Sequence, residues 1–477
     1  MPIDSAIVSS EATFQLSLDL DAPERASTAT MAGSTPVFRP IHYLGSKLRF
    51  AHTIADALDE VEASRGPVLD LFAGSGTTAL ALSAKRTVIA TDIQEYSRVL
   101  CSALLSKRRL SEGIVTTFAQ KLKRGTALMA KLRHAVAPLI EFEEAALKAA
   151  ASGDGEPICA LLESGSLLAA ELSQPLGTQK ELHDALREAV RRLSESGLSG
   201  SRLATTVRYF GGAYFSYEQA VDLDCLAALA NEYTPDLADL FTAVLLSTAS
   251  DSVNTVGKQF AQPIRPRTKQ GEIKRHLLSK IQRDRRVDVR STYIEWLKRY
   301  IKHNPSGTSH RAIRSDYRDA LKDLKGQYSV VYADPPYTRD HYSRFYHVLE
   351  TMARRDNPAI ARNPGAHEGG LSRGLYREDR HQSPFCIKSQ CVPAFRDMFR
   401  LAAEGSANLV LSYSPFDSGA HPRLMQIDAL VDLAREFYQS VELESVSGVA
   451  HSKLNHSRLN FDQPEEAEVL LVCRLTR

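Results

Sequence analysis

A short stretch ending at Tyr337 joins a predicted strand to a rigid carboxylate. Residues Val330–Ala333 favour β-structure and run directly into Asp334, Pro335, Pro336 and Tyr337. We expect the strand to stop there, because each proline lacks a backbone N–H donor and has a fixed φ angle. The Asp334 carboxylate and the Pro335 carbonyl would then face one space, beside an aromatic ring. These groups could hold a flat molecule that carries an NH₂ group; the alternative is a proline-rich turn after a buried strand.

A glycine-rich turn predicts a second ligand-binding element. Residues 68–72 read as a buried strand, and Gly74–Thr77 lead into an apolar helical segment. Glycines let the backbone approach a ligand closely, and a helix N-terminus offers free N–H groups. The next predicted strand, 87–91, ends at Asp92, 18 residues after Gly74. An acid at this position typically binds the two hydroxyls of a ribose.

A third segment precedes a predicted helix. Gly45 and Ser46 allow a tight turn, and Ser46 is a suitable N-cap for the helical pattern that follows. Lys47, at the start of that helix, could form an ion pair with a bound carboxylate. The Tyr209–Tyr217 aromatic cluster has two interpretations, as core of its region or as a surface that contacts bases.

Alternating strands and helices predict the scaffold that positions these segments. Further strands are expected at 313–317, 409–414, 441–445 and 467–475, and helices at 320–324, 342–349 and 395–403. This alternation is typical of a doubly wound α/β sheet, with the last two strands as an edge hairpin. Residues 98–199 have the amphipathic spacing of several helices and no apparent chemistry.

Basic residues are concentrated between 258 and 314. This span has 16 lysines and arginines against four acidic residues, whereas the formal net charge of the whole chain is only +2. Such a block predicts a surface for a polyanion, the alternative being a solvated helical face. The candidate binding residues are Lys258, Arg265, Arg267, Lys269, Lys274, Arg275, Arg283, Arg285 and Arg286.

Composition narrows the class of protein. The chain has 477 residues, 43% hydrophobic and 24% charged, which is ordinary for a globular protein with a substantial core. The six cysteines show no metal-ligand spacing, so no metal is expected, and reduced thiols indicate a cytoplasmic location. Residues 1–36 are predicted to be a disordered acidic tail. Within them, Gln15–Leu20 resembles the short peptides that dock bacterial proteins on the sliding clamp, although alternating leucines can also arise by chance.

In this order, the motifs resemble the Dam-like (D12, or alpha-class) adenine-N6 methyltransferases of DNA, which have a DPPY motif. The resemblance implies a Rossmann-like S-adenosylmethionine-dependent catalytic domain from residues 37–98 and 310–477. It assigns residues 99–309 as an inserted, mainly helical target-recognition region. The implied catalytic residues are Asp334, Pro335, Pro336 and Tyr337. The implied cofactor-binding residues are Tyr43, Lys47, Asp70, Phe72, Gly74, Ser75, Gly76, Thr77, Asp92 and Asp316.

The resemblance implies methyl transfer to the N6 amino group of a flipped-out adenine in double-stranded DNA, with Tyr337 stacked on the base. Alternative acceptors are cytosine N4, an RNA adenine or a glutamine amide. A catalytically silent DNA-binding accessory protein on the same fold is a further alternative. The sequence shows no nuclease cluster, which leaves a separate restriction or defence partner as a candidate.

Overall fold

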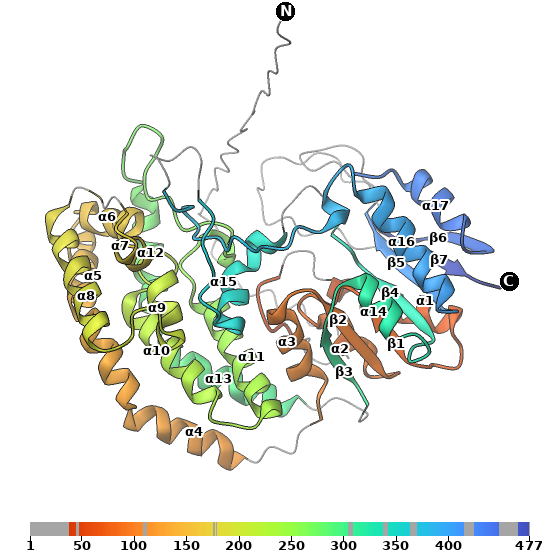
Figure 1. Ribbon diagram of the computed structural model, residues 1–477, viewed down its shortest axis with the longest axis horizontal. Coiled ribbons are helices and arrows are strands. Elements are labelled where there is room, and N and C mark those ends of the chain that lie inside the picture. Colours follow the sequence, from red (N-terminus) through yellow and green to blue (C-terminus); the bar gives the residue numbers. More distant parts are fainter. Residues whose placement is uncertain are drawn as a thin grey trace, which may run out of the picture.

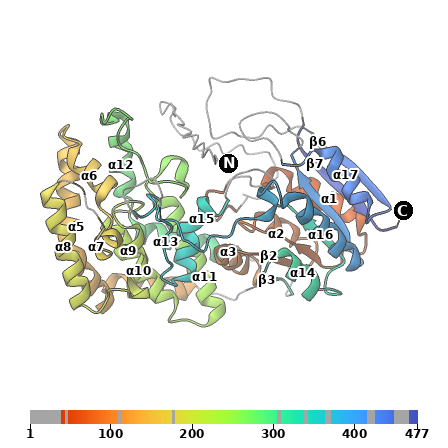
Figure 2. The same cartoon turned by 45° about the horizontal axis from the view of Figure 1, so that its top comes forward.

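The computed structural model describes residues 38–43, 47–107, 112–174, 177, 179–303, 309–336, 342–362, 370–414, 424–447 and 466–476. The predicted tail with its Gln15–Leu20 motif, the Gly45–Ser46 turn and Tyr337 lie outside these residues. The described part has two lobes (Figure 1 and Figure 2), one built on a β-sheet and the other made of helices.

The sheet has seven strands in the order β3-β2-β1-β4-β5-β7-β6. The strands are β1 (Val68–Asp70), β2 (Val88–Asp92), β3 (Arg311–Arg314), β4 (Val330–Ala333), β5 (Asn408–Tyr413), β6 (Ser440–Ser447) and β7 (Glu466–Arg474). The strands from β3 to β5 pair in parallel, and β7 is antiparallel to both β5 and β6. The predicted α/β class is confirmed, and β3 begins two residues before its predicted start.

Strand register brings three of the predicted segments to one edge of the sheet. Asp70, the last residue of β1, is opposite Tyr332 in β4 and Ala90 in β2. The turn that follows β1, the end of β2 at Asp92, and Asp334 directly after β4 therefore meet at the carboxyl ends of parallel strands. In open α/β sheets, ligands bind outside this edge.

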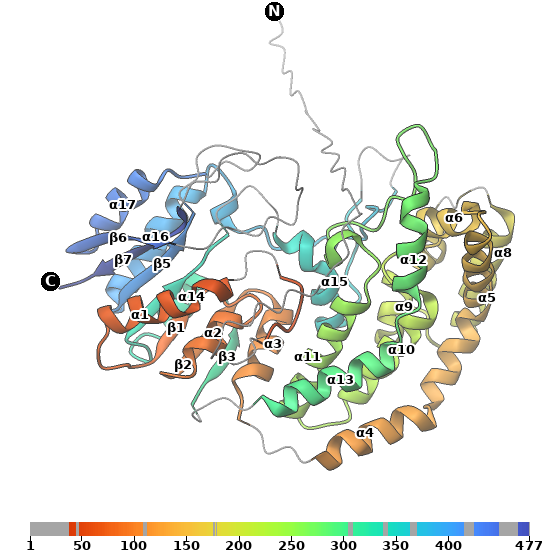
Figure 3. The same ribbon diagram turned by 180° about the vertical axis from the view of Figure 1, so that it is seen from behind.

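Helices cover both faces of the sheet. One face packs on α1 (Ala51–Val61) and α2 (Thr77–Leu82), which are seen in Figure 3. The other face packs on α14 (Tyr317–Asp323), α16 (Cys391–Glu404) and α17 (Ile427–Arg435). Because strands buried on both faces favour apolar residues, β4 reads as a continuous hydrophobic run, and β1 does so up to its last residue, Asp70.

The helical lobe comes from the long segment between β2 and β3. It contains α4 (Glu112–Arg124), α5 (Ala127–Ala151), α6 (Glu156–Ser164), α7 (Leu167–Glu171), α8 (Lys180–Glu195), α9 (Thr205–Phe210), α10 (Tyr217–Ala230), α11 (Pro235–Ser252), α12 (Leu278–Arg285) and α13 (Val289–Lys302). Short 3₁₀ turns are η1 (Lys47–Phe50), η2 (Arg202–Ala204), η3 (Val256–Lys258), η4 (Arg275–Leu277) and η6 (Pro384–Cys386). The predicted helical character of residues 98–199 is confirmed.

Two helices link the sheet lobe to the helical lobe. Helices α3 (Glu95–Leu105) and α15 (Tyr342–Arg354) both contribute buried residues to the core of the helical lobe. The Tyr209–Tyr217 aromatic cluster belongs to the same core: Tyr214, for example, is 0% exposed. Core packing is thus the correct interpretation of that cluster, and base contact is not. No helix among the described residues is long and apolar enough to cross a membrane.

Candidate active site

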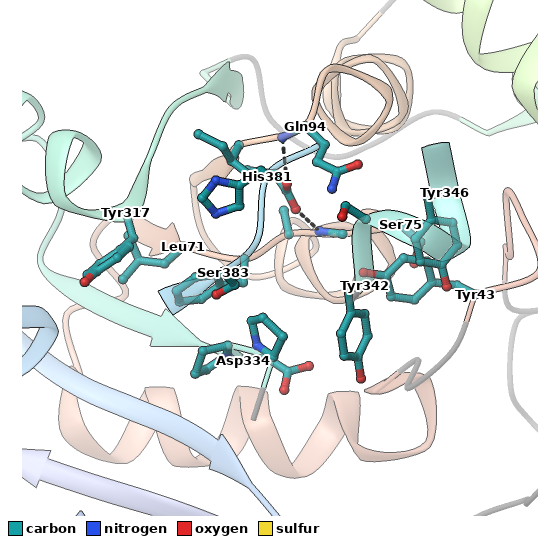
Figure 4. Close-up of a pocket in the computed structure, with 18 of the residues that line it drawn as sticks. Tyr43, Leu71, Ser75, Gln94, Tyr317, Asp334, Tyr342, Tyr346, His381 and Ser383 are labelled. Atoms are coloured by element: carbon teal, nitrogen blue, oxygen red, sulfur yellow. Dashed lines mark hydrogen bonds between the residues drawn. The ribbon is translucent and has the colours of Figure 1, made fainter. Parts of the chain in front are cut away.

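A cleft lies at the carboxyl edge of β1, β2 and β4 (Figure 4). Its empty space, open mouth included, is about 1180 Å³. Predicted residues that line it are Tyr43, Lys47, Phe72, Gly74, Ser75, Thr77, Asp92, Asp316, Asp334, Pro335 and Pro336. Asp70 and Gly76 were also predicted to bind the cofactor, but they are not in its wall.

The glycine-rich turn is held closely against its neighbours. Gly74 has φ +52°, and a Cβ at this position would lie 2.4 Å from the Tyr43 hydroxyl oxygen. The Gly74 N–H donates to Asp92 Oδ2 at 3.0 Å, and the Gln94 N–H donates to Asp92 Oδ1 at 2.9 Å. Burial raises the pKa of Asp92, and these two N–H donors oppose that shift. The turn and the predicted ribose-binding acid therefore form one rigid unit.

Gly76 supports the turn from behind. It has φ +76° and is the N-cap residue of α2. A Cβ here would lie 3.0 Å from Leu104 Cδ1 and 3.1 Å from Cys101 Sγ, both on α3. The second glycine thus allows α2 and α3 to pack closely.

An aromatic wall closes one side of the cleft. The rings of Tyr43 and Tyr346 stack at 4.8 Å with 17° between their planes, and Tyr96 stacks on Tyr346 at 5.3 Å. Figure 4 shows Tyr342 and Tyr346 together on α15 facing the same cleft. Of these tyrosines, only Tyr43 was predicted to line the site. Tyr342 and Tyr346 could have been found from their spacing of four residues, which places both side chains on one face of a helix.

The Asp334 carboxylate is held by a buried lysine. Lys47 Nζ lies 3.3 Å from Asp334 Oδ1 and 2.7 Å from Glu468 Oε1. The side chains of Lys47 and Glu468 are 3% and 0% exposed, whereas that of Asp334 is 21% exposed. Lys47 therefore fixes the carboxylate from behind while leaving it open to the cleft. It was predicted to face a cofactor carboxylate, which would have to compete with these two partners.

Asp70 lies behind this carboxylate and is protonated more readily than an ordinary aspartate. Burial, followed by the negative charge of Asp334, raises the pKa of Asp70 to about 8. Its position at the end of β1 places it in the protein interior, 1% exposed.

A further carboxylate, that of Asp316, and a histidine, His381, line the cleft. Asp316 is the N-cap residue of α14, and its side chain accepts from the Arg318 N–H at 2.9 Å. His381 is close enough to Asp316 and Asp92 for both carboxylates to act on its charge. Burial lowers the pKa of His381, while the two carboxylates oppose the shift. His381 was not predicted, because it lies in a loop without a recognisable pattern.

The predicted basic residues occupy different environments. Arg265, Lys269, Arg275, Arg283 and Arg286 are exposed, and Lys274 is half-buried. Arg267 forms ion pairs with Glu156 and Glu163 at 2.6 and 3.1 Å.

Two members of the basic block act inside the protein, which corrects their assignment to a DNA surface. The Arg285 guanidinium is 0% exposed, forms an ion pair with Glu143 and donates to the Gly212 carbonyl. Lys258 Nζ donates to the Asp251 and Val253 carbonyls at 2.9 and 3.0 Å, beside Asp284. In both cases the positive charge is bound by carbonyls and carboxylates of the protein itself, where a DNA phosphate was expected.

Comparison with known proteins agrees with this geometry. The family described as D12 class N6 adenine-specific DNA methyltransferase matches residues 43–129 and 274–368, which include the glycine-rich turn and the Asp-Pro-Pro segment. These two segments of the chain are therefore similar to this family. D12 methyltransferases use S-adenosylmethionine.

Three curated relatives match parts of this chain. Modification methylase LlaI of Lactococcus lactis subsp. lactis is 30% identical over 149 residues, which are 31% of this chain and 20% of the relative. Modification methylase StsI of Streptococcus sanguinis is 24% identical over 144 residues, 29% of this chain and 20% of the relative. Type II methyltransferase M.NlaIII of Neisseria lactamica is 28% identical over 91 residues, which are 19% of this chain and 23% of the relative.

The chain thus spans only about a fifth of the length of each of these relatives. No solved structure matches it significantly. Among the described residues, no group of three or more His, Cys, Asp or Glu side chains is arranged to hold a metal ion.

Proposed function

We propose that this protein transfers a methyl group from S-adenosylmethionine to N6 of an adenine in double-stranded DNA. The observation that carries the proposal is the shared cleft. The rigid Asp334-Pro335-Pro336 segment faces the same space as the Gly74 turn and Asp92. The cofactor, when bound, supplies an electrophilic methyl group, and the residues of the chain bind and orient its partners.

The residues present fit this cofactor. Asp92 has a fixed orientation suited to two ribose hydroxyls, and Asp316 in the same cleft could accept from an adenine amino group. The close backbone approach at Gly74 leaves room for the methionine part beside the turn.

The catalytic segment would act mainly by orientation. The Asp334 carboxylate and the Pro335 carbonyl would accept the two hydrogens of the base NH₂ group, which draws the nitrogen lone pair out of conjugation with the ring. Lys47 keeps the carboxylate in place through the contact of 3.3 Å. Preorganised acceptors of this kind can supply a large part of a rate enhancement. Because the amino group is inaccessible inside a duplex, the base must be flipped out.

The helical lobe is the proposed target-recognition region, covering residues 99–309. Five exposed basic residues support it as a DNA-binding surface, namely Arg265, Lys269, Arg275, Arg283 and Arg286. A protein of this function would work at the nucleoid in the cytoplasm. We also propose two protein partners: the sliding clamp, bound through Gln15–Leu20, and a cognate restriction or defence protein. The second partner is supported by the names of the relatives LlaI and StsI, which are modification methylases.

Nucleoside analysis of DNA tests the proposal. DNA from a host that lacks its own methylases is incubated with the purified protein and labelled S-adenosylmethionine, then digested and separated. The expected product is N6-methyladenine. Label in N4-methylcytosine, in RNA or in protein would replace the proposed acceptor by one of the alternatives, and the absence of any transfer would favour a silent accessory protein.

A further inference from the structure

Four arginines gather around Tyr376, and only one of them, Arg265, belongs to the predicted basic block. They come from three segments: Arg265 from the loop before η4, Arg344 from α15, and Arg373 and Arg380 from the segment between α15 and α16. We call this group the Tyr376 arginine cluster. Figure 1 shows that the segment between α15 and α16 crosses from the helical lobe to the sheet lobe.

Contacts with Tyr376 hold the cluster together. The guanidinium carbons of Arg380 and Arg344 lie 4.7 and 5.9 Å from the centre of the Tyr376 ring. Burial raises the pKa of Tyr376, and the positive charges of all four arginines oppose this shift. The Tyr376 hydroxyl donates to the Ala261 carbonyl, which ties the ring to the loop that carries Arg265.

These arginines differ from their neighbours in what they bind. Within the described residues, none of the four guanidinium groups has a carboxylate partner: Arg373 donates to the Ile264 carbonyl and Arg380 to the Arg377 carbonyl. Arg344 Nε and Arg380 Nη1 are buried nitrogen atoms without a hydrogen-bond partner. In the same part of the chain, by contrast, Arg377 forms ion pairs with Asp356 and Asp379 at 2.7 and 2.9 Å.

Like charges at close range repel each other, and a buried N–H donor without an acceptor costs free energy. Burial and the charge of Arg344 accordingly lower the pKa of Arg380. An anion placed among the guanidinium groups would relieve both costs. Phosphate suits them best, because guanidinium groups donate in a planar fork that matches its oxygens.

The position of the cluster indicates which phosphate this is. Ser343 and His381 line the active-site cleft, and each is next in sequence to an arginine of the cluster, Arg344 and Arg380 respectively. Two arginines of the cluster therefore adjoin the wall of the cleft in sequence. A DNA strand that placed a base in the cleft would carry its phosphates past this part of the protein.

We propose that the Tyr376 arginine cluster binds a backbone phosphate of DNA beside the flipped-out nucleotide. The proposal rests on the proposed function, because it takes DNA as the substrate. It adds Arg344, Arg373 and Arg380 to the proposed DNA-binding surface, which already includes Arg265. Such a contact fixes the strand in register without reading its sequence.

The salt dependence of DNA binding tests the proposal. The affinity of the full-length protein for a labelled duplex of mixed sequence is measured by fluorescence anisotropy between about 50 and 200 mM salt. The variants are Arg344→Gln, Arg373→Gln and their double variant. Arg187→Gln is the matched control, because Arg187 is an exposed arginine on α8, at the outer edge of the helical lobe in Figure 1. Each phosphate contact accounts for about 0.9 in the slope of log affinity against log salt.

We expect the double variant to lose about one phosphate contact. Between about 50 and 200 mM salt, the factor by which the wild type loses affinity should then be about 3.5 times the factor for the double variant. Arg344→Lys with Arg373→Lys should recover the slope, because lysine keeps the charge. Retained S-adenosylmethionine binding shows that the variants are folded.

Other results would overturn the proposal. A wild-type slope in the double variant, or an equal loss in Arg187→Gln, would show that the cluster does not bind DNA specifically. Loss of binding to inorganic phosphate with an unchanged DNA slope would make the cluster a site for a free anion. These outcomes leave the proposed function standing if N6-methyladenine is still formed. Methylation of another acceptor, with no DNA binding by the wild type, would instead refute both.

Discussion

Replacement of Asp70 by asparagine should flatten the pH dependence of the protein's stability. The carboxyl group of Asp70 is 1% exposed at the end of β1. Burial first, and the negative charge of Asp334 next, raise its pKa to about 8. The unfolded chain would titrate at this residue near a pKa of about 3.9. At a pH between these two pKa values, Asp70 keeps its proton in the folded protein and releases it in the unfolded chain.

The sign of the effect follows from this difference. The contribution of Asp70 to the free energy of unfolding is fully present below about pH 4 and is lost as the pH rises through about 8. A difference of about four pH units corresponds to on the order of 5 kcal/mol. Asparagine has nearly the same shape and cannot ionise, so Asp70→Asn should be increasingly more stable than the wild type as the pH rises.

Urea titrations at several pH values from about 5 to 8.5, followed by circular dichroism, give the free energy of unfolding. We expect a smaller loss for Asp70→Asn than for the wild type over this range. Asp56→Asn is the control, because that carboxylate on α1 is 74% exposed. If the Asp70→Asn and wild-type curves remained parallel, the reasoning about a buried, protonated carboxyl would be wrong.

Two further substitutions test the packing of the site and the corrected part of the basic block. Gly74→Ala should weaken S-adenosylmethionine binding at least tenfold in a calorimetric titration, because the new Cβ would lie 2.4 Å from the Tyr43 hydroxyl oxygen at a φ of +52°; unchanged affinity would contradict the tight turn. Arg285→Gln should lower the free energy of unfolding by about 3–5 kcal/mol, because it leaves Glu143 buried without its ion pair. The exposed neighbour Arg286→Gln should change it by less than about 0.5 kcal/mol, and equal effects would refute the distinction.

Local patterns predicted the central part of the site because the chemistry there depends on short segments. The strand Val330–Ala333 had to end at two prolines, and the Gly74 turn had to connect a buried strand to a helix. Both features follow from backbone geometry, which adjacent residues determine. The parallel register then brings Asp92 and Asp334 to one edge without further information.

Contacts between distant segments could not be predicted in this way. Glu468 contacts Lys47 across 421 residues, and it occurs in a strand whose other buried positions are apolar. Its charge in such a strand was a signal, but nothing local identified the partner. Arg285 and Arg286 show the same limit, because neighbours of identical charge become a buried ion pair and an exposed side chain once α12 packs.

The most direct test of the account compares Asp334→Ala with the wild type in methyl transfer and in cofactor binding. Transfer of label from S-adenosylmethionine to adenine N6 is measured with DNA, and the affinity for the cofactor is measured by calorimetry. Because Asp334 is proposed to hold the amino group of the base, we expect the variant to lose detectable transfer while it binds S-adenosylmethionine within about threefold of the wild type. Transfer at the wild-type rate, or loss of transfer caused by loss of cofactor binding, would contradict the role assigned to this carboxylate.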